Sequence, residues 1–225
     1  MTFSLAVRCA RTGMFGAVVS SSSPAVAARC AFARTSVGAA CSQNITDPRL
    51  GPRLLDLLAS GLDADAALST VVAEAPHVAH RQLTVVDARG RAAAYSGAGT
   101  LGTYATHVAP DCVAAGNLLS STDVPPAMAA AFARDPEAHL GDRLVAALRA
   151  ALDAGGEEGP VRSCGMVLVR DVEWYVADLR VDWSEGDPIA DLERLWEVYA
   201  PQLDAYVTRA LDPTAAPSYG VPGDE

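Results

Sequence analysis

Thr2-Phe-Ser-Leu-Ala-Val-Arg8 carries large apolar side chains at positions 3, 5 and 7, with smaller or polar side chains between them. Because successive side chains of a β-strand point to opposite faces, this spacing predicts a strand with one buried face. The turn Ala10-Arg-Thr-Gly13 follows, and after it comes an apolar run at residues 14–20. Two such runs joined by a glycine-containing turn are typical of a β-hairpin, so the chain is predicted to open with antiparallel strands.

The rest of the chain is predicted to alternate groups of strands with groups of helices. Asp47-Pro48 is a typical helix start, and the leucines at 54, 55, 57 and 58 predict a helix that Gly61 ends. Asp63 and Pro76 mark the limits of a second helix in the same way. Further strands are predicted over residues 25–33, 36–43, 82–87, 91–96, 112–119, 166–170 and 174–180. Further helices are predicted over residues 125–134, 137–153 and 188–210.

This order of elements predicts the fold class. Hairpins joined by pairs of helices indicate antiparallel sheets with helices stacked outside them, rather than a parallel sheet of β-α-β units. The chain has 225 residues, half of them apolar, and a chain of that size buries roughly 70% of its unfolded surface. Residues 1–211 are predicted to form one domain, and residues 212–225, rich in Pro and Gly, a flexible tail.

The charge balance excludes several classes of function. The chain has 27 acidic and 17 basic residues, and its net charge of −10 argues against nucleic acid or an anionic membrane as partner. All 17 basic residues are Arg, which excludes a Schiff-base lysine, a phosphate-loop lysine and a Ser-Lys dyad. The chain shows neither the roughly 18 to 20 apolar residues of a membrane span nor a basic secretory signal. A cytoplasmic protein is therefore predicted.

Three local patterns suggest other chemistries, and each has a simpler interpretation. The five Cys are odd in number and contain no Cys-x-x-Cys pair, so Cys41 is interpreted as a buried hydrophobe rather than a thiol nucleophile. His77 and His80 have the spacing of a helical metal pair, but Pro76 interrupts the helix and a third ligand is lacking. Gly97-Ala-Gly-Thr-Leu-Gly102 matches a dinucleotide loop, but no convincing helix follows it. No metal and no cofactor are predicted.

Several longer strings point to one bacterial family. They are Asp47-Pro-x-x-Gly-Pro-Arg53, Arg81-Gln82, Val85-Val-Asp-x-x-Gly-Arg-Ala92, Ala115-Gly-Asn-Leu-Leu119 and Asp178-Leu-Arg-Val-Asp182. With the opening Met-Thr-Phe-Ser, they resemble domain-of-unknown-function family 1028 from residue 2 to about residue 199. That family is similar to the N-terminal nucleophile (Ntn) hydrolases. The resemblance implies an α+β fold, a four-layer α-β-β-α sandwich of two antiparallel sheets with helices outside.

The resemblance also implies a nucleophile. Ntn enzymes attack with the side chain of their first residue and use its free α-amine as general base, and Thr2 takes that place once Met1 is removed. An α-amine has a reference pKa of about 7.7 to 8.0, so it can accept a proton near neutral pH. Methionine is normally trimmed before a residue as small as threonine, so no propeptide cleavage is expected.

Further residues are predicted to surround Thr2. By comparison of strand order with the Ntn arrangement, the backbone N–H groups around Ser42 would stabilise an oxyanion, and Arg29 would lower the pKa of the nucleophile. Asn117 ends a central strand and would donate its amide to the same oxyanion. The candidate substrate contacts are Ser20, Ser21, Gln43 and Ser163.

Each of these side chains also has a purely structural interpretation. The serines at 20–23 with Pro24 can form a polar turn, and Arg29 can pair with a carboxylate. Asn117 follows a glycine and can be a turn residue, while Gln43-Asn44 can cap the following helix.

Two functions of different classes are consistent with these observations. The first is an amidohydrolase, acting on a non-peptide C–N bond, in which Thr2 attacks an amide or lactam carbonyl of a small polar metabolite. The second is a non-catalytic Ntn-fold protein that binds a ligand or serves in an assembly. A small-molecule substrate and a homodimer are predicted, and no nucleic-acid or membrane partner.

Overall fold

Two antiparallel β-sheets lie at the centre of the computed structural model, which describes residues 1–222. The strands are β1 (Thr2–Arg8), β2 (Phe15–Ser21), β3 (Ala31–Arg34), β4 (Gly38–Asn44), β5 (Arg81–Asp87), β6 (Ala92–Ser96), β7 (Ala105–Ala109), β8 (Cys112–Asn117), β9 (Ser163–Val169) and β10 (Ala177–Val181). The larger sheet has six strands in the order β10-β9-β2-β1-β8-β7, and the smaller has four in the order β3-β4-β5-β6.

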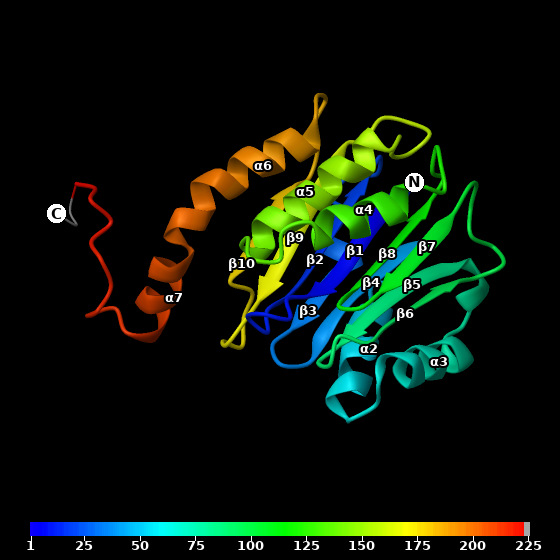
Figure 1. Cartoon of the computed structure of the whole chain (residues 1–225), viewed down its shortest axis with the longest axis horizontal. Coiled ribbons are helices and arrows are strands. Elements are labelled where there is room, and N and C mark those ends of the chain that lie inside the picture. Colours follow the sequence, from blue (N-terminus) through cyan, green and yellow to red (C-terminus); the bar gives the residue numbers. More distant parts are fainter. Residues whose placement is uncertain (223–225) are drawn as a thin grey trace.

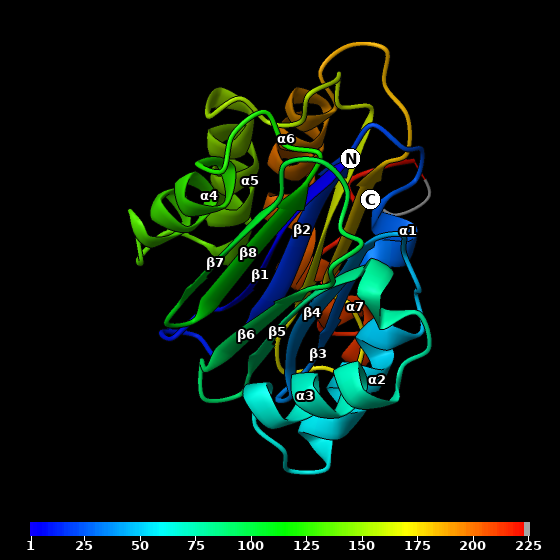
Figure 2. The same cartoon turned by 90° about the vertical axis from the view of Figure 1, so that its right-hand side faces the viewer.

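Helices cover the outer faces of the two sheets. The helices are α1 (Ala27–Cys30), α2 (Leu50–Ala59), α3 (Ala64–Glu74), α4 (Val124–Ala133), α5 (Leu140–Asp153), α6 (Pro188–Tyr199) and α7 (Leu203–Leu211), with 3-10 turns η1 (Val78–His80) and η2 (Ala200–Gln202). The short helix α1 is an exception, because its buried side chains pack into the layer between the sheets. Figure 1 shows α4, α5 and α6 over the six-stranded sheet, and Figure 2 shows α2 and α3 against the four-stranded sheet. A mixed α+β fold with two antiparallel sheets is thereby confirmed.

The alternation in β1 sends its side chains into two different layers. The side chains at positions 3, 5 and 7 are fully buried in the core under α4, α5 and α6, where each contributes about 1.5–3 kcal/mol of hydrophobic stabilisation. Ala6 faces the four-stranded sheet, in a layer lined mostly by alanines and valines. Thr2 and Ser4 share the face of Ala6, because every second residue of a strand points the same way. The first residue of β1 therefore points between the sheets.

The predicted strand over residues 25–33 is wrong in its first half. Ala25 has φ of 51°, in the left-handed region, and the short helix α1 follows it before β3 begins. Two bonds hold this turn against the six-stranded sheet: the Ala25 N–H donates to the Asp182 carbonyl at 2.8 Å and the Val26 N–H to Ser163 Oγ at 3.2 Å. Alanine favours helix over strand, so α1 agrees with the local composition.

Several other elements also differ from the sequence predictions at their ends, in their extent or in being unpredicted, and three of them show why. Strand β7 was not predicted, because it lies at a sheet edge and alternates between exposed and half-buried side chains instead of burying an apolar face. Helix α5 begins three residues later than predicted, where His139 Nδ1 accepts from the Gly141 N–H at 3.1 Å. The last predicted helix divides into α6 and α7 at η2, where Pro201 has no N–H to continue the ladder.

The C-terminal end follows α7. Residues 212–222 are mostly exposed, and positions 223–225 of the predicted tail lie outside the described residues. The division into a domain and a flexible tail stays a prediction. Within residues 1–222, no helix combines the length and the apolar character needed to cross a bilayer.

A buried carboxylate ties the β5–β6 turn to α3. Asp87 accepts hydrogen bonds from the N–H groups of Arg89 at 2.8 Å, Arg91 at 3.1 Å and Ala64 at 3.3 Å, and from Arg91 Nε at 2.7 Å. Burial raises the pKa of Asp87, but these hydrogen bonds and the Arg91 charge together hold it below its usual value. The charged Asp87 carboxylate therefore connects the β5–β6 hairpin to the start of α3 through hydrogen bonds.

Replacing this carboxylate should destabilise the fold in a pH-dependent way. We expect Asp87→Asn to lower the free energy of unfolding by about 2 kcal/mol at pH 7, measured by urea denaturation, because an amide cannot accept from all four donors. A lowered folded pKa contributes stability above the unfolded value near 4 and loses it as the pH falls further, so the difference should shrink in acid. The control is Asp65→Asn, the same change at an exposed position in the first turn of α3, which should cost less than about 0.5 kcal/mol. Equal losses in the two variants would contradict the stabilising role of the Asp87 carboxylate.

Candidate active site

Thr2 begins β1 and is buried, with 6% of its surface exposed. Its hydroxyl donates to the Met1 carbonyl and lies 3.3 Å from Ser21 Oγ. The Ser21 hydroxyl donates to the same Met1 carbonyl. Two hydroxyl groups from neighbouring strands therefore meet at the peptide bond that joins Met1 to Thr2.

Thr2 belongs to a row of four polar side chains across the six-stranded sheet. Thr2 pairs with Asn117 of β8, and Ser21 of β2 pairs with Ser163 of β9. Because Phe3 pairs with Ser20, Thr2 lies beside Ser21 on the neighbouring strand. The order Ser163, Ser21, Thr2, Asn117 thus runs across the four inner strands of the sheet, and all four side chains are buried.

A second polar row lies opposite, on the four-stranded sheet. Gln43 pairs with Gln82, and Gln82 pairs with Ser96, on β4, β5 and β6 respectively. Gln82 Oε1 accepts from Gln43 Nε2 at 2.8 Å and from Asn117 Nδ2 at 3.1 Å. Gln82 Nε2 donates to Ser96 Oγ and to the Gly116 carbonyl, both at 3.0 Å. These bonds use the two donors and two acceptor lone pairs of one amide, and two of them join the sheets.

Four buried side-chain oxygens near these rows have no hydrogen-bond partner within residues 1–222. Two are the hydroxyl oxygens of Ser4 and Thr84, one step further along the inward faces of β1 and β5. The other two, Gln43 Oε1 and Glu157 Oε1, are acceptors only. An unpaired buried acceptor costs roughly 1–3 kcal/mol, so both oxygens are suited to a donor that arrives with a ligand or with a rearranged N-terminus.

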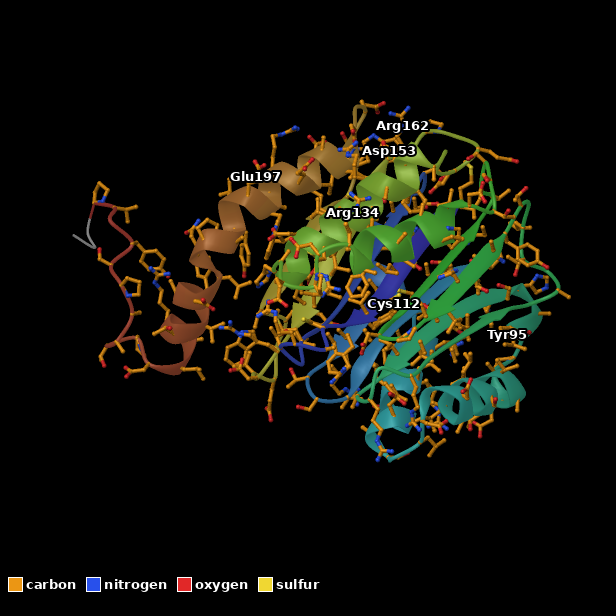
Figure 3. All side chains as sticks on the ribbon, in the orientation of Figure 1. Tyr95, Cys112, Arg134, Asp153, Arg162 and Glu197 are labelled. Carbon is orange, nitrogen blue, oxygen red and sulfur yellow. The ribbon has the colours of Figure 1, made fainter. Side chains whose placement is uncertain are left out.

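Glu157 comes from the loop between α5 and β9. This loop lies between Asp153 and Arg162, at the end of the molecule where the chain begins (Figures 1 and 3). Glu157 Oε2 accepts from the Ser22 N–H at 3.1 Å. Burial raises the pKa of Glu157 to about 7, against the opposing effects of the N-terminal ammonium group and the Ser22 hydrogen bonds.

The structure brings together five of the eight predicted site residues. Thr2, Asn117, Ser21, Gln43 and Ser163 line the space between the sheets at one end. The Ser163 hydroxyl donates to the Ser23 carbonyl at 2.6 Å, so it also braces the turn after β2.

The other three predicted residues lie elsewhere. The Ser42 side chain points to the helix side of its sheet, where its hydroxyl donates to the Asp47 carbonyl at 2.9 Å; the role of the backbone N–H groups around Ser42 stays a prediction. Ser20 points to the opposite face from Ser21, and its hydroxyl donates to the Ser163 carbonyl at 3.2 Å. Adjacent residues of a strand face opposite ways, so neither can share the inward face of its neighbour. Arg29 donates to carbonyl groups of its own turn, those of Pro24 at 2.6 Å and Ala25 at 2.9 Å.

Sequence reasoning missed Gln82, Ser96 and Glu157. The signal for Gln82 was present, because Gln82 and Thr84 precede Val86 at two-residue spacing and place polar groups on the inward face of β5. Ser96 occupies the matching position on the paired strand. Glu157 sits in a loop, where no periodic pattern assigns a direction to its side chain.

The structure gives little support to a Cys41 nucleophile or to a metal site at His77 and His80. Burial raises the pKa of Cys41 to about 12, which keeps its thiol protonated and a poor nucleophile near neutral pH. All five cysteines are free and buried, and the interpretation of Cys41 as a buried residue is confirmed. Within residues 1–222, no three or more His, Cys, Asp or Glu side chains are grouped to hold a metal ion, and His77 is the left-handed residue before η1.

Comparison with known proteins agrees with this architecture. The chain matches the family of unknown function DUF1028 over residues 2–192 and belongs to that family. It is similar to the crystal structure of protein SPO2555 from Silicibacter pomeroyi, of the same family, with 28% identity, a TM-score of 0.81 and coverage of 88% of this chain and 85% of that chain. Anbu (ancestral beta-subunit) from Yersinia bercovieri is a more distant neighbour, with 10% identity, a TM-score of 0.41 and coverage of 91% and 97%. No curated protein matches the chain significantly.

The stability of the fold should depend on the Gln82 amide, whose hydrogen bonds join the two sheets. We expect Gln82→Leu to lower the free energy of unfolding by about 2–4 kcal/mol, because it leaves the amides of Gln43 and Asn117 and the Gly116 carbonyl without partners. Urea denaturation at pH 7 measures this. Gln202→Leu, the same change at an exposed position, is the control and should stay within about 0.5 kcal/mol; a neutral Gln82→Leu would show that the network does not hold the sheets together.

Proposed function

We propose that the protein is an Ntn amidohydrolase in which Thr2, freed by removal of Met1, cleaves an amide or lactam bond of a small polar metabolite. The observation that carries this proposal is the place of the Thr2 hydroxyl, at the start of a central strand and buried among polar side chains between two sheets.

The fold supports the same assignment. Helices, six-stranded sheet, four-stranded sheet and helices follow one another across the molecule (Figure 2), which favours the four-layer α-β-β-α sandwich that the family resemblance implies. In such a sandwich the first strand is central, and the first residue opens onto the space between the sheets. Thr2 meets that description, with β2 on one side and β8 on the other.

The chemistry follows from the groups around Thr2. The α-amine of Thr2 takes the hydroxyl proton as Oγ1 bonds to the substrate carbonyl carbon, and a tetrahedral intermediate forms. The C–N bond then breaks, the ammonium proton passes to the leaving nitrogen, and an ester to Thr2 remains. Water, deprotonated by the same amine, attacks the ester carbonyl carbon. As the C–O bond to Thr2 breaks, the ammonium proton returns to Oγ1, and a carboxylic acid is released.

Two side chains are placed to stabilise the developing oxyanion. The Ser21 hydroxyl already donates to a carbonyl beside Thr2, that of Met1. The Asn117 amide has two N–H groups, of which one is donated to Gln82, and the other is free to turn toward the substrate. One well-placed oxyanion donor contributes about 2.7–4 kcal/mol to catalysis.

The polar rows also bear on substrate class. Gln43 Oε1 is a buried acceptor without a partner, which suits an N–H or O–H group of the substrate. The two rows themselves contain only hydroxyl and carboxamide side chains, so they favour a neutral polar group beside the scissile bond.

A reactive β-lactone probe tests the nucleophile. We expect Thr2→Ala to reduce covalent labelling by at least about 10³-fold, because it removes the attacking oxygen, while Thr2→Ser keeps a hydroxyl and labels measurably. Cys41→Ala is the matched control for a competing nucleophile and should label like the wild type. Intact mass measures the adduct and shows at the same time whether Met1 is absent.

Two results would contradict the proposal. Labelling that survives in Thr2→Ala would place the nucleophile elsewhere. Retained Met1 in the purified protein would block the α-amine, and its carbonyl would keep both hydroxyl groups occupied; the non-catalytic ligand-binding or assembly protein would then be the better hypothesis.

A further inference from the structure

The backbone around Glu157 is fixed to the strand that pairs with Thr2. Glu157 forms an antiparallel bridge with Leu119, and the Glu158 N–H donates to the Leu118 carbonyl at 3.0 Å. These partners directly follow Asn117, the residue opposite Thr2. The position of Glu157 is therefore set by β8, although the residue belongs to a loop.

Contacts of its neighbours indicate that the Glu157 carboxylate is near the first peptide bond of the chain. Its Oε2 accepts from the Ser22 N–H at 3.1 Å, and the preceding Ser21 hydroxyl is 3.3 Å from that of Thr2. Continuing the β1–β2 register by one residue puts Met1 opposite Ser22. Gly159 of the same loop lies against Met1, since a Cβ built on Gly159 would be 3.0 Å from Met1 Cε.

This carboxylate lacks a partner for its second oxygen. Glu157 is 6% exposed, and its Oε1 has no hydrogen bond within residues 1–222. The N-terminal ammonium group is the charge that opposes the effect of burial on the pKa of Glu157. A positively charged N–H donor is the partner that such an oxygen binds best.

We propose that Glu157 is a positioning residue that binds the α-amine of Thr2 and holds it beside the Thr2 hydroxyl. This inference rests on the proposed function, because it requires that Met1 be removed. Removal of Met1 leaves the α-amine on Thr2, one residue and up to about 3.8 Å further along β1. By the β1–β2 register, this nitrogen lies between the positions opposite Ser21 and Ser22. Glu157 already contacts Ser22 there.

With Glu157 in this role, the site contains a nucleophile (Thr2 Oγ1), a base (the Thr2 α-amine) and a group that orients the base (Glu157). As Thr2 Oγ1 attacks, its proton moves to the amine lone pair and an ammonium group forms. The Glu157 carboxylate stabilises that ammonium and orients the amine, in the way that a buried aspartate serves the histidine of a serine protease. The proton then leaves with the product amine, so Glu157 itself gains and loses none.

The composition makes a direct test possible. The chain contains no Lys, so the α-amine is its single primary amine, and reductive methylation with ¹³C-formaldehyde labels that group alone. NMR titration of the labelled methyl carbons then gives the midpoint at which the amine loses its charge. We expect Glu157→Gln to lower this midpoint by about one pH unit, because a neutral amide no longer stabilises the ammonium. Glu158→Gln, the same change at an exposed neighbour, should leave it unchanged.

The wild-type protein supplies a second measurement that needs no variant to fold. Its amine should titrate at higher pH in the folded chain than in guanidinium chloride, where no pairing survives. A folded midpoint at or below the unfolded one, or equal midpoints in wild type and Glu157→Gln, would overturn the role of Glu157.

The outcomes separate this inference from the proposed function. Intact mass with Met1 retained overturns both. Labelling at Thr2 by the β-lactone with a midpoint insensitive to Glu157→Gln overturns only the inference. A midpoint that falls in Glu157→Gln, without labelling at Thr2, supports the pairing and overturns the amidohydrolase.

Discussion

The pairing of β1 between β2 and β8 is the constraint on which the other features depend. It buries the apolar side chains of β1 under α4, α5 and α6, and it points Thr2, Ser4 and Ala6 at the four-stranded sheet. A shift of one residue in this register would exchange the two sets, placing large apolar side chains between the sheets and hydroxyl groups in the helix-covered core. The energetic cost of that exchange fixes the position of Thr2.

Polar groups between two sheets are stable only where they are paired, and Gln82 shows how the protein meets this requirement. Its amide uses all of its hydrogen-bonding capacity on four partners, and two of these bonds join the sheets. Gln43 Oε1 and Glu157 Oε1 are left unpaired close by. Ser4 Oγ and Thr84 Oγ1, further along the same inward faces, are also unpaired, and native proteins keep few such atoms.

Much of this arrangement was predictable from the residues. The period-two pattern of β1 and the caps at Asp63 and Gly61 correctly indicated strands and helices, and Thr2, Ser21, Gln43, Asn117 and Ser163 do gather at one end of the sheets. Ser20 was chosen together with its neighbour Ser21, and strand geometry turns its side chain to the other face. Strand β7 was not predicted, because an exposed edge strand needs no apolar face and so leaves no period-two pattern.

The sequence by itself determined which side of each strand is apolar and that the chain belongs with helix-covered antiparallel sheets. Only the tertiary structure decided that Gln82 bridges to Asn117 and that a loop 155 residues downstream of Thr2 brings Glu157 to Ser22. The reason is physical: local periodicity reports the burial of one face, whereas contacts between distant segments depend on sheet register and on the path of a loop, which no short pattern encodes.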